Sequence, residues 1–131
     1  MNLIHVSGKR KKAVARATLK PGNGTVRVNK KLLDIIMPPL ARLKMREPLI
    51  LAGSAADKVN ISVNVHGGGS MSQAEAARLA IAKALAMHDK KLRPVFLEYD
   101  RNMLVADVRR KEPKKPNSHG KARSKTQKSY R

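Results

Sequence analysis

The chain has 131 residues, with 29 Lys or Arg against nine Asp or Glu, and a formal net charge of +20 at pH 7. It contains no Cys, which excludes disulfides, thiolate zinc sites and thiol catalysis. No apolar run approaches the roughly 20 residues that cross a bilayer, and the amino-terminal charges follow an apolar stretch, the reverse of a signal peptide. We therefore expect a cytoplasmic protein that does not bind membranes.

The charge divides the chain into two parts. Residues 109–131 hold ten Lys or Arg and one acid, Glu112, and so carry +9, whereas the other 108 residues hold 19 Lys or Arg against eight acids and carry +11. Residues 109–131 also lack bulky aliphatic side chains, so they cannot bury enough surface to offset the entropy of ordering. We expect a globular domain over residues 1–108 and an extended basic arm over 109–131 that is disordered until it meets a polyanion.

The amino-terminal part of the domain predicts strands. Residues 13–20 and 25–28 alternate between apolar and polar side chains, and the Pro-Gly-Asn-Gly sequence at 21–24 between them is a strong turn signal. This pattern predicts a hairpin of 13–20 with 25–28, and a further strand over residues 2–7 beside it.

The middle of the chain predicts helices and one clear strand. A helical pattern begins at Lys30, and the prolines at 38, 39 and 48 divide it into two short helices, 30–37 and 40–47, followed by a connector over 48–53. Residues 58–66 alternate strictly and predict a strand.

The carboxyl-terminal part of the domain predicts one long helix. Ser72 and Glu75 have the spacing of a capping box, and apolar residues recur at helical spacing to about Asp89. A short helical turn is expected over 94–99 and an extended piece over 103–108. The predicted fold is α+β, with a mixed sheet of about four strands, helices on one face and a basic arm.

Two clusters are candidate phosphate contacts. Lys9, Arg10, Lys11 and Lys12 lie together in the sequence, with Arg16 shortly after them, and in so basic a chain we expect them to bind nucleic acid, although such a run can also be a solvated face. The glycines at 67–69 lie between a strand and a helix. They can form an anion site or serve only as a tight turn. These glycines are Gly67, Gly68 and Gly69.

The sequence offers no catalytic constellation. The four His are widely spaced, so a metal set is not expected, and Glu98, Asp100 and Asp107 are more simply read as solvated acids than as magnesium ligands. We expect neither an enzyme nor a cofactor. Aromatic residues make up 2% of the chain, so recognition should rest on phosphates and shape rather than on stacked bases.

Four segments together resemble the ribosomal protein S9 family of the small subunit. They are GKRKKAVARATLKPGNGTVRVN at 8–29, VNVHGGGSMSQAEAARLAIAKAL at 63–85, LRPVFLEYDRNMLVADVRRKEPKK at 92–115 and KARSKTQKSYR at 121–131. The last of these is similar to the archaeal and eukaryotic branch. The resemblance implies a fold like the second domain of ribosomal protein S5, and a place on 16S rRNA in the head of the 30S subunit, beside other head proteins and not as a homo-oligomer.

The resemblance also implies contacts along the arm, whose end approaches the P-site tRNA. By position, Lys128, Tyr130 and Arg131 lie where the family contacts tRNA. The arm residues expected to contact rRNA are Arg109, Arg110, Lys111, Lys114, Lys115, Lys121, Arg123 and Lys125. Two other functions stay open: a protein subunit of an RNA-processing ribonucleoprotein such as RNase P, and a basic architectural DNA-binding protein.

Overall fold

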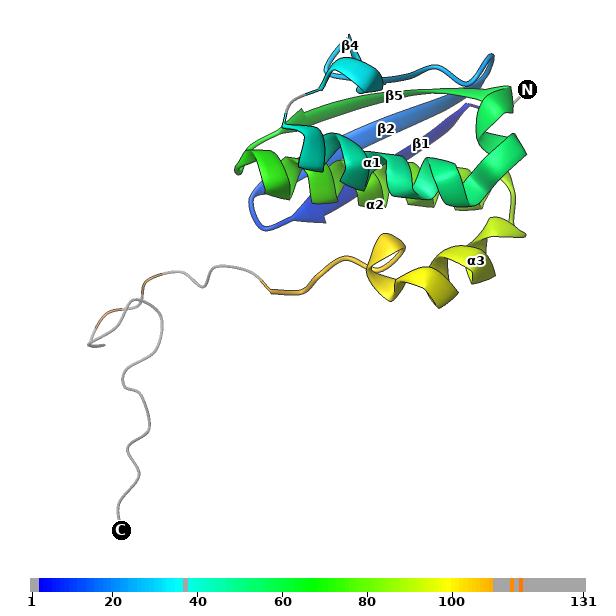
Figure 1. The fold of residues 1–131 in the computed structure, drawn as a ribbon. Helices are drawn as coiled ribbons and strands as arrows, with labels where there is room; N and C mark the ends of the chain where they lie inside the picture. The colour runs from blue at the N-terminus through cyan, green and yellow to red at the C-terminus, as the bar shows by residue number, and fades with distance from the viewer. Residues whose placement is uncertain (1–2, 37, 110–113, 115, 117–131) are drawn as a thin grey trace.

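The computed structural model describes residues 3–36, 38–109, 114 and 116. Within them, a five-stranded sheet packs against three α-helices that lie on one of its sides (Figure 1). The expected α+β fold with helices on one face is thus confirmed. The strands are β1 (Ile4–Arg10), β2 (Ala13–Pro21), β3 (Val26–Val28), β4 (Lys31–Leu32) and β5 (Val59–His66), and the helices are α1 (Pro39–Ala52), α2 (Ser70–His88) and α3 (Leu92–Tyr99).

The sheet has the order β1-β2-β5-β3-β4, which contradicts the predicted hairpin of β2 with β3. Strand β5 lies between these two, antiparallel to β2 and parallel to β3. The Pro-Gly-Asn-Gly segment bends around the start of β5 instead of closing a hairpin. There, the N–H of Gly22 donates to the carbonyl of Lys58 (2.9 Å), and the Asn60 Oδ1 atom accepts from the N–H groups of Asn23 (2.9 Å) and Thr25 (3.1 Å).

The predicted helix over 30–37 is wrong, because a hairpin of β3 and β4 occupies its start. Asn29 and Lys30 have φ values of 51° and 70°, the left-handed pair that a two-residue hairpin turn requires. The Asn29 side chain also bonds both backbone groups of Val65, which secures the turn to β5. Only a 3-10 turn, η1 (Leu33–Ile35), follows before residue 37.

Helix α1 is one continuous helix, so the expected end before Pro48 is also wrong. Pro39 stands at its first turn, where a missing N–H costs nothing, but Pro48 lies inside it. Ala41, Met45, Pro48 and Ala52 are buried at spacings of four, three and four residues. The burial of this stripe, mainly against α2, outweighs the backbone bond that Pro48 removes. Another 3-10 segment, η2 (Gly53–Lys58), then leads into β5.

Helix α2 begins at Ser70 with Gly69 as its N-cap, so the predicted capping box of Ser72 with Glu75 does not form. The expected end near residue 89 is confirmed at His88.

Small side chains let this helix approach the sheet closely. A Cβ atom on Gly8 of β1 would lie 2.5 Å from the Ala76 carbonyl oxygen and 2.8 Å from the Ala80 nitrogen.

The core lies between the sheet and α2, with α1 and α3 packed against α2. Phe96 of α3 and Met103 are completely buried. Met103 closes a 3-10 turn, η3 (Arg101–Met103), and a turn and a bend follow at residues 104 and 105, so the predicted extended piece does not begin at 103. Residues 106–109 form neither helix nor strand.

No helix covers the opposite side of the sheet in the described part of the chain. Side chains alternate along each strand, so that one set is buried under α2 and the other projects away from the helices. We call this second set the outer face. It consists of His5, Ser7 and Lys9 of β1, Val14, Arg16, Thr18 and Lys20 of β2, Arg27 of β3, Leu32 of β4, and Asn60, Ser62, Asn64 and His66 of β5.

Replacing Gly8 should test the close approach of helix and sheet. We expect Gly8→Ala to lower the free energy of unfolding by about 1–3 kcal/mol, because the new methyl group meets helix backbone that cannot move aside. The measurement is a denaturant titration followed by circular dichroism. The control is Ser7→Ala on the exposed outer face, with an expected change within about 0.5 kcal/mol. Equal midpoints for the two variants would show that the contact is not tight.

Candidate nucleic-acid interface

The first candidate element is the basic turn between β1 and β2. Arg10 pairs with Ala13 in the register of the hairpin, so Lys11 and Lys12 form its two-residue loop, with Lys11 at a φ of 54°. Lys9, Lys11 and Lys12 are exposed. The loop therefore presents cations at one end of the sheet.

The glycine turn lies directly beside this basic turn. Gly67 and Gly68 have φ values of 79° and 65°, which favour glycine, and a Cβ atom on Gly67 would lie 2.5 Å from the Lys12 carbonyl oxygen. Figure 1 shows the β1–β2 loop and the β5–α2 connection at the same end of the domain. The fold thus brings together two sites predicted from the sequence, although Lys12 and Gly67 are 55 residues apart in the chain. The backbone conformation and close packing explain why residues 67 and 68 are glycines.

The start of α2 adds a third element at this end. Gly69, the N-cap, makes no side-chain cap bond, and the first turn carries no acid. The first N–H groups of a helix have no partner within it, and with the helix dipole they favour an anion. A Cβ atom on Gly69 would meet nothing within 4 Å, so the approach to these N–H groups is open.

Arg10 has a different place from its three neighbours in the sequence. Its strand position directs it toward the helices, where its Nε atom lies 2.6 Å from Oε2 of Glu75 and its Nη2 atom 3.7 Å from Oδ2 of Asp107. Its side chain is 15% exposed. Arg10 therefore serves as an internal cation in this structure, and the two-residue alternation of a strand was the signal that separated it from Lys9.

The last described residues of the domain are held at the same end. Arg109 binds the Asp107 carboxylate through Nη2 (2.6 Å) and Nε (3.0 and 3.1 Å), and Asp107 also faces Arg10. These bonds from Arg109 hold the pKa of the Asp107 carboxyl well below its usual range. The chain consequently leaves the domain beside the basic turn.

Glu75 of α2 links this ion network to α1. Partial burial alone would raise its pKa, but hydrogen bonds from Lys44 Nζ (3.0 Å) and Arg10 Nε (2.6 Å) together lower the pKa below its ordinary value of 4.5. The carboxylate is thus neutralised by two cations, and the acids near this end leave little net negative charge to repel a phosphate.

The remaining predicted site residues are divided between two regions. Arg16 projects from the outer face and is exposed, and Lys114 is also exposed. The other arm residues lie outside the described part of the chain: Arg110, Lys111, Lys115, Lys121, Arg123, Lys125, Lys128, Tyr130 and Arg131.

Several exposed cations were not singled out from the sequence. Lys30 and Lys31 belong to the β3–β4 hairpin, which points toward the same end as the basic turn because β3 runs parallel to β5. Lys20 and Arg27 lie on the outer face. The alternation of residues 13–20 already assigned Lys20 to the face of Arg16, but finding Lys30 required recognising a turn inside an apparently helical pattern.

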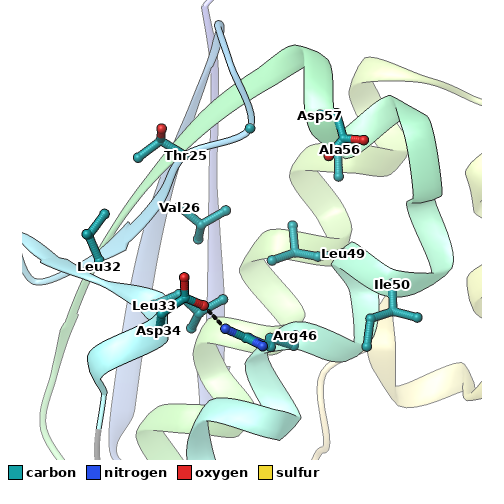
Figure 2. A pocket seen from close by; sticks show the side chains of 11 residues that line it. Thr25, Val26, Leu32, Leu33, Asp34, Arg46, Leu49, Ile50, Ala56 and Asp57 are labelled. Atoms are coloured by element: carbon teal, nitrogen blue, oxygen red, sulfur yellow. Dashed lines mark ion pairs between the residues drawn. The ribbon is translucent and has the colours of Figure 1, made fainter.

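A groove of about 400 Å³ between α1 and the β3–β4 hairpin has a different character. Figure 2 shows apolar side chains on both walls, with an ion pair of Asp34 and Arg46 between them. Asp57 also lines the groove. Two acids against one cation make it a poor site for a polyanion.

The described residues form neither a metal centre nor a membrane-spanning helix. No three of their His, Asp or Glu side chains are arranged to hold a metal ion. None of the described helices is long and apolar enough to cross a membrane.

Comparison with known proteins shows the family of this chain. The family model described as ribosomal protein S9/S16 matches residues 8–131. The chain belongs to the ribosomal protein S9 family. Among its S9 relatives, the small ribosomal subunit protein uS9 of Methanococcus maripaludis strain C7 and that of strain S2 are each 46% identical over 134 aligned positions, which cover the whole of both chains. The resemblance noted in the sequence is confirmed.

The ion network predicts how stability depends on pH. The pKa of Glu75 in the folded protein lies below 4.5. The ionised carboxylate therefore stabilises the fold fully above pH 4.5, and this stabilisation is lost as the pH falls through the pKa of the folded protein. We expect Glu75→Gln to lower the free energy of unfolding at pH 7 by about 1 kcal/mol and to make its decline below pH 4.5 shallower. Glu98→Gln is the control, since Glu98 is exposed and makes no ion pair among the described residues. Parallel curves for wild type and Glu75→Gln would contradict this role.

Proposed function

We propose that this chain is a structural constituent of the small ribosomal subunit that binds 16S rRNA in the head of the 30S subunit. The observation that carries the proposal is the meeting of the basic turn, the glycine turn and the start of α2 at one end of the domain. Membership of the S9 family, and the name of the relatives, support the ribosome as its place.

The chemistry of this end favours phosphates over bases. Lys9 and Lys12 supply charge, and the helix start supplies N–H donors for an anion. Among the described aromatic residues, Phe96 is buried in the core and Tyr99 lies on α3, so neither offers a stacking platform beside the basic turn. Docking consequently needs neither a cofactor nor a chemical step, and the protein acts in the cytoplasm as a structural protein and not as an enzyme.

The arm extends the contact from rRNA to tRNA. The bonds of Asp107 to Arg10 and Arg109 direct the chain out of the domain at the end that docks on rRNA. From there, ten cations over residues 109–131 neutralise phosphates that would otherwise repel one another. Lys128, Tyr130 and Arg131 contact the P-site tRNA in this proposal, with the Arg131 guanidinium able to bind a phosphate through two N–H groups.

Contacts with neighbouring head proteins are assigned to α1. Leu40, Leu43 and Ile50 project from this helix with 58%, 56% and 73% of their surface exposed, at spacings that place them on one side. The apolar groove of Figure 2 adjoins Ile50. A protein neighbour is a better fit for this surface than RNA, because exposed apolar groups gain from burial against other apolar groups.

Two other functions make different predictions. A protein subunit of an RNA-processing particle would co-sediment with a tRNA-processing RNA rather than with 30S particles. An architectural DNA-binding protein would bind duplex DNA as well as small-subunit rRNA, and would insert an apolar wedge between bases. Competition between rRNA and duplex DNA separates these cases from the proposal.

Removing two cations of the basic turn should weaken rRNA binding. We expect Lys9→Ala/Lys12→Ala to bind a transcript of the 16S head domain about tenfold less tightly at physiological salt and to show a shallower slope of log K against log[salt], by about 1.4–1.8. The control is Lys90→Ala/Lys91→Ala, which removes two exposed cations at the far end of α2, about 28 Å away. Equal losses for the two variants would argue against a specific docking end.

The reach of the arm is tested by crosslinking. A photoreactive residue at position 130 should crosslink to P-site tRNA in translating ribosomes, because the proposal brings Tyr130 to the tRNA. The same residue at position 90, on the opposite end of the domain from the basic turn, is the control and should give no tRNA product. Crosslinks from position 130 to rRNA alone would limit the arm to a scaffolding role.

A further inference from the structure

The charged side chains of the outer face of the sheet are all of one sign. This face carries Lys9, Arg16, Lys20 and Arg27 and no acid. The described acids lie on the helices and in the loops, and all the ion pairs among the described residues are made there, away from the outer face. The outer face therefore carries positive charge that no described acid neutralises.

The strand register arranges these cations regularly. Arg16 pairs with Ser7 and Asn64, Arg27 lies beside Ser62, and Lys20 pairs with Asn60, so neutral hydrogen-bonding side chains lie next to three of the four cations. The register aligns these residues in rows across the sheet, and each row holds one cation. The first row is Lys9, Val14 and His66, and the second is Ser7, Arg16 and Asn64. The third row is His5, Thr18, Ser62 and Arg27, and the fourth is Lys20 and Asn60.

The spacing of the cations suits separate phosphates. Neighbouring strands lie about 4.8 Å apart and alternate residues about 6.7 Å apart, so Lys9 and Arg16 are about 8 Å apart and Arg16 and Lys20 about 13 Å apart. Charges at these distances are about a Debye length apart or more at physiological salt. They do not repel one another strongly, and each can neutralise a different phosphate.

The neutral side chains indicate which part of a nucleic acid this face can recognise. Ser, Thr and Asn both donate and accept hydrogen bonds, as a ribose 2′-hydroxyl requires of its partner. The outer face holds no aromatic ring on which a base could stack, and its apolar side chains are Val14 and Leu32, the latter at the β4 edge. The chemistry therefore matches the sugar–phosphate backbone of a folded RNA rather than exposed bases.

We infer that the outer face is a second rRNA-binding surface, which lies along the sugar–phosphate backbone of folded RNA with Lys20 and Arg27 as contacts outside the basic turn. The inference rests on the proposed function and extends it from one end of the domain to the whole uncovered side of the sheet. An acidic protein would be the other occupant with matching charge, but a protein-covered sheet face is normally apolar, whereas this one is almost entirely polar.

The test removes the two cations that the basic turn does not include. We expect Lys20→Ala/Arg27→Ala in the full chain to bind the 16S head-domain transcript about tenfold less tightly, with a salt slope shallower by about 1.4–1.8. Lys20→Arg/Arg27→Lys, which keeps both charges, should bind like the wild type. Ser62→Glu, which places an acid between β2 and β3 on the exposed face, should weaken binding without changing the thermal midpoint by more than the Ser7→Ala control does.

The outcomes separate this inference from the proposed function. Failure of the wild type to bind the transcript would count against the proposed function itself. A second outcome is that the wild type binds and that only Lys9→Ala/Lys12→Ala weakens binding. If Lys20→Ala/Arg27→Ala then binds as tightly as the wild type, the inference is overturned and the basic end alone holds the RNA. Unchanged RNA affinity with lost incorporation into reconstituted small subunits would also overturn it, because a protein would then cover the outer face.

Discussion

The close packing of α2 on the first two strands is the constraint on which the rest of the structure depends. Gly8 leaves no room for a side chain between β1 and the backbone of Ala76 and Ala80. This contact fixes the axis of α2 across the sheet and brings its amino terminus next to the β1–β2 loop. Because all helices gather on the side of α2, the other side of the sheet stays bare.

The distribution of charge follows from this one-sided architecture. Acids on the helical side bind Arg10, Lys44 and Arg78, so these cations act within the protein. Among the described residues, no acid forms an ion pair with Lys9, Lys12 or the other cations of the outer face. A chain of +20 net charge therefore folds with internal ion pairs on one side and keeps its available positive charge for an external polyanion.

The surfaces of this S9-family protein differ in chemistry, and each suits a different kind of partner. The basic end and the outer face suit RNA phosphates, and the exposed apolar side of α1 suits protein. Asp107 connects the domain to the arm by binding Arg10 on one side and Arg109 on the other. In the proposed function, this junction sets the starting point of the arm at the end of the domain that contacts RNA.

The sequence by itself determined the elements whose signal is local. The alternation of 58–66 and the periodicity after Gly69 correctly predicted β5 and α2, and composition alone indicated a polyanion as partner. Tertiary structure decided the rest. Strand β5 lies between β2 and β3 because pairing between strands depends on distant backbone. Burial of the α1 stripe that includes Pro48 keeps the helix continuous through a residue that normally ends one. Strand alternation places the adjacent Lys9 and Arg10 on opposite faces of the sheet, and the packing of α2 decided that Arg10 became the internal ion-pair partner and Lys9 the exposed cation.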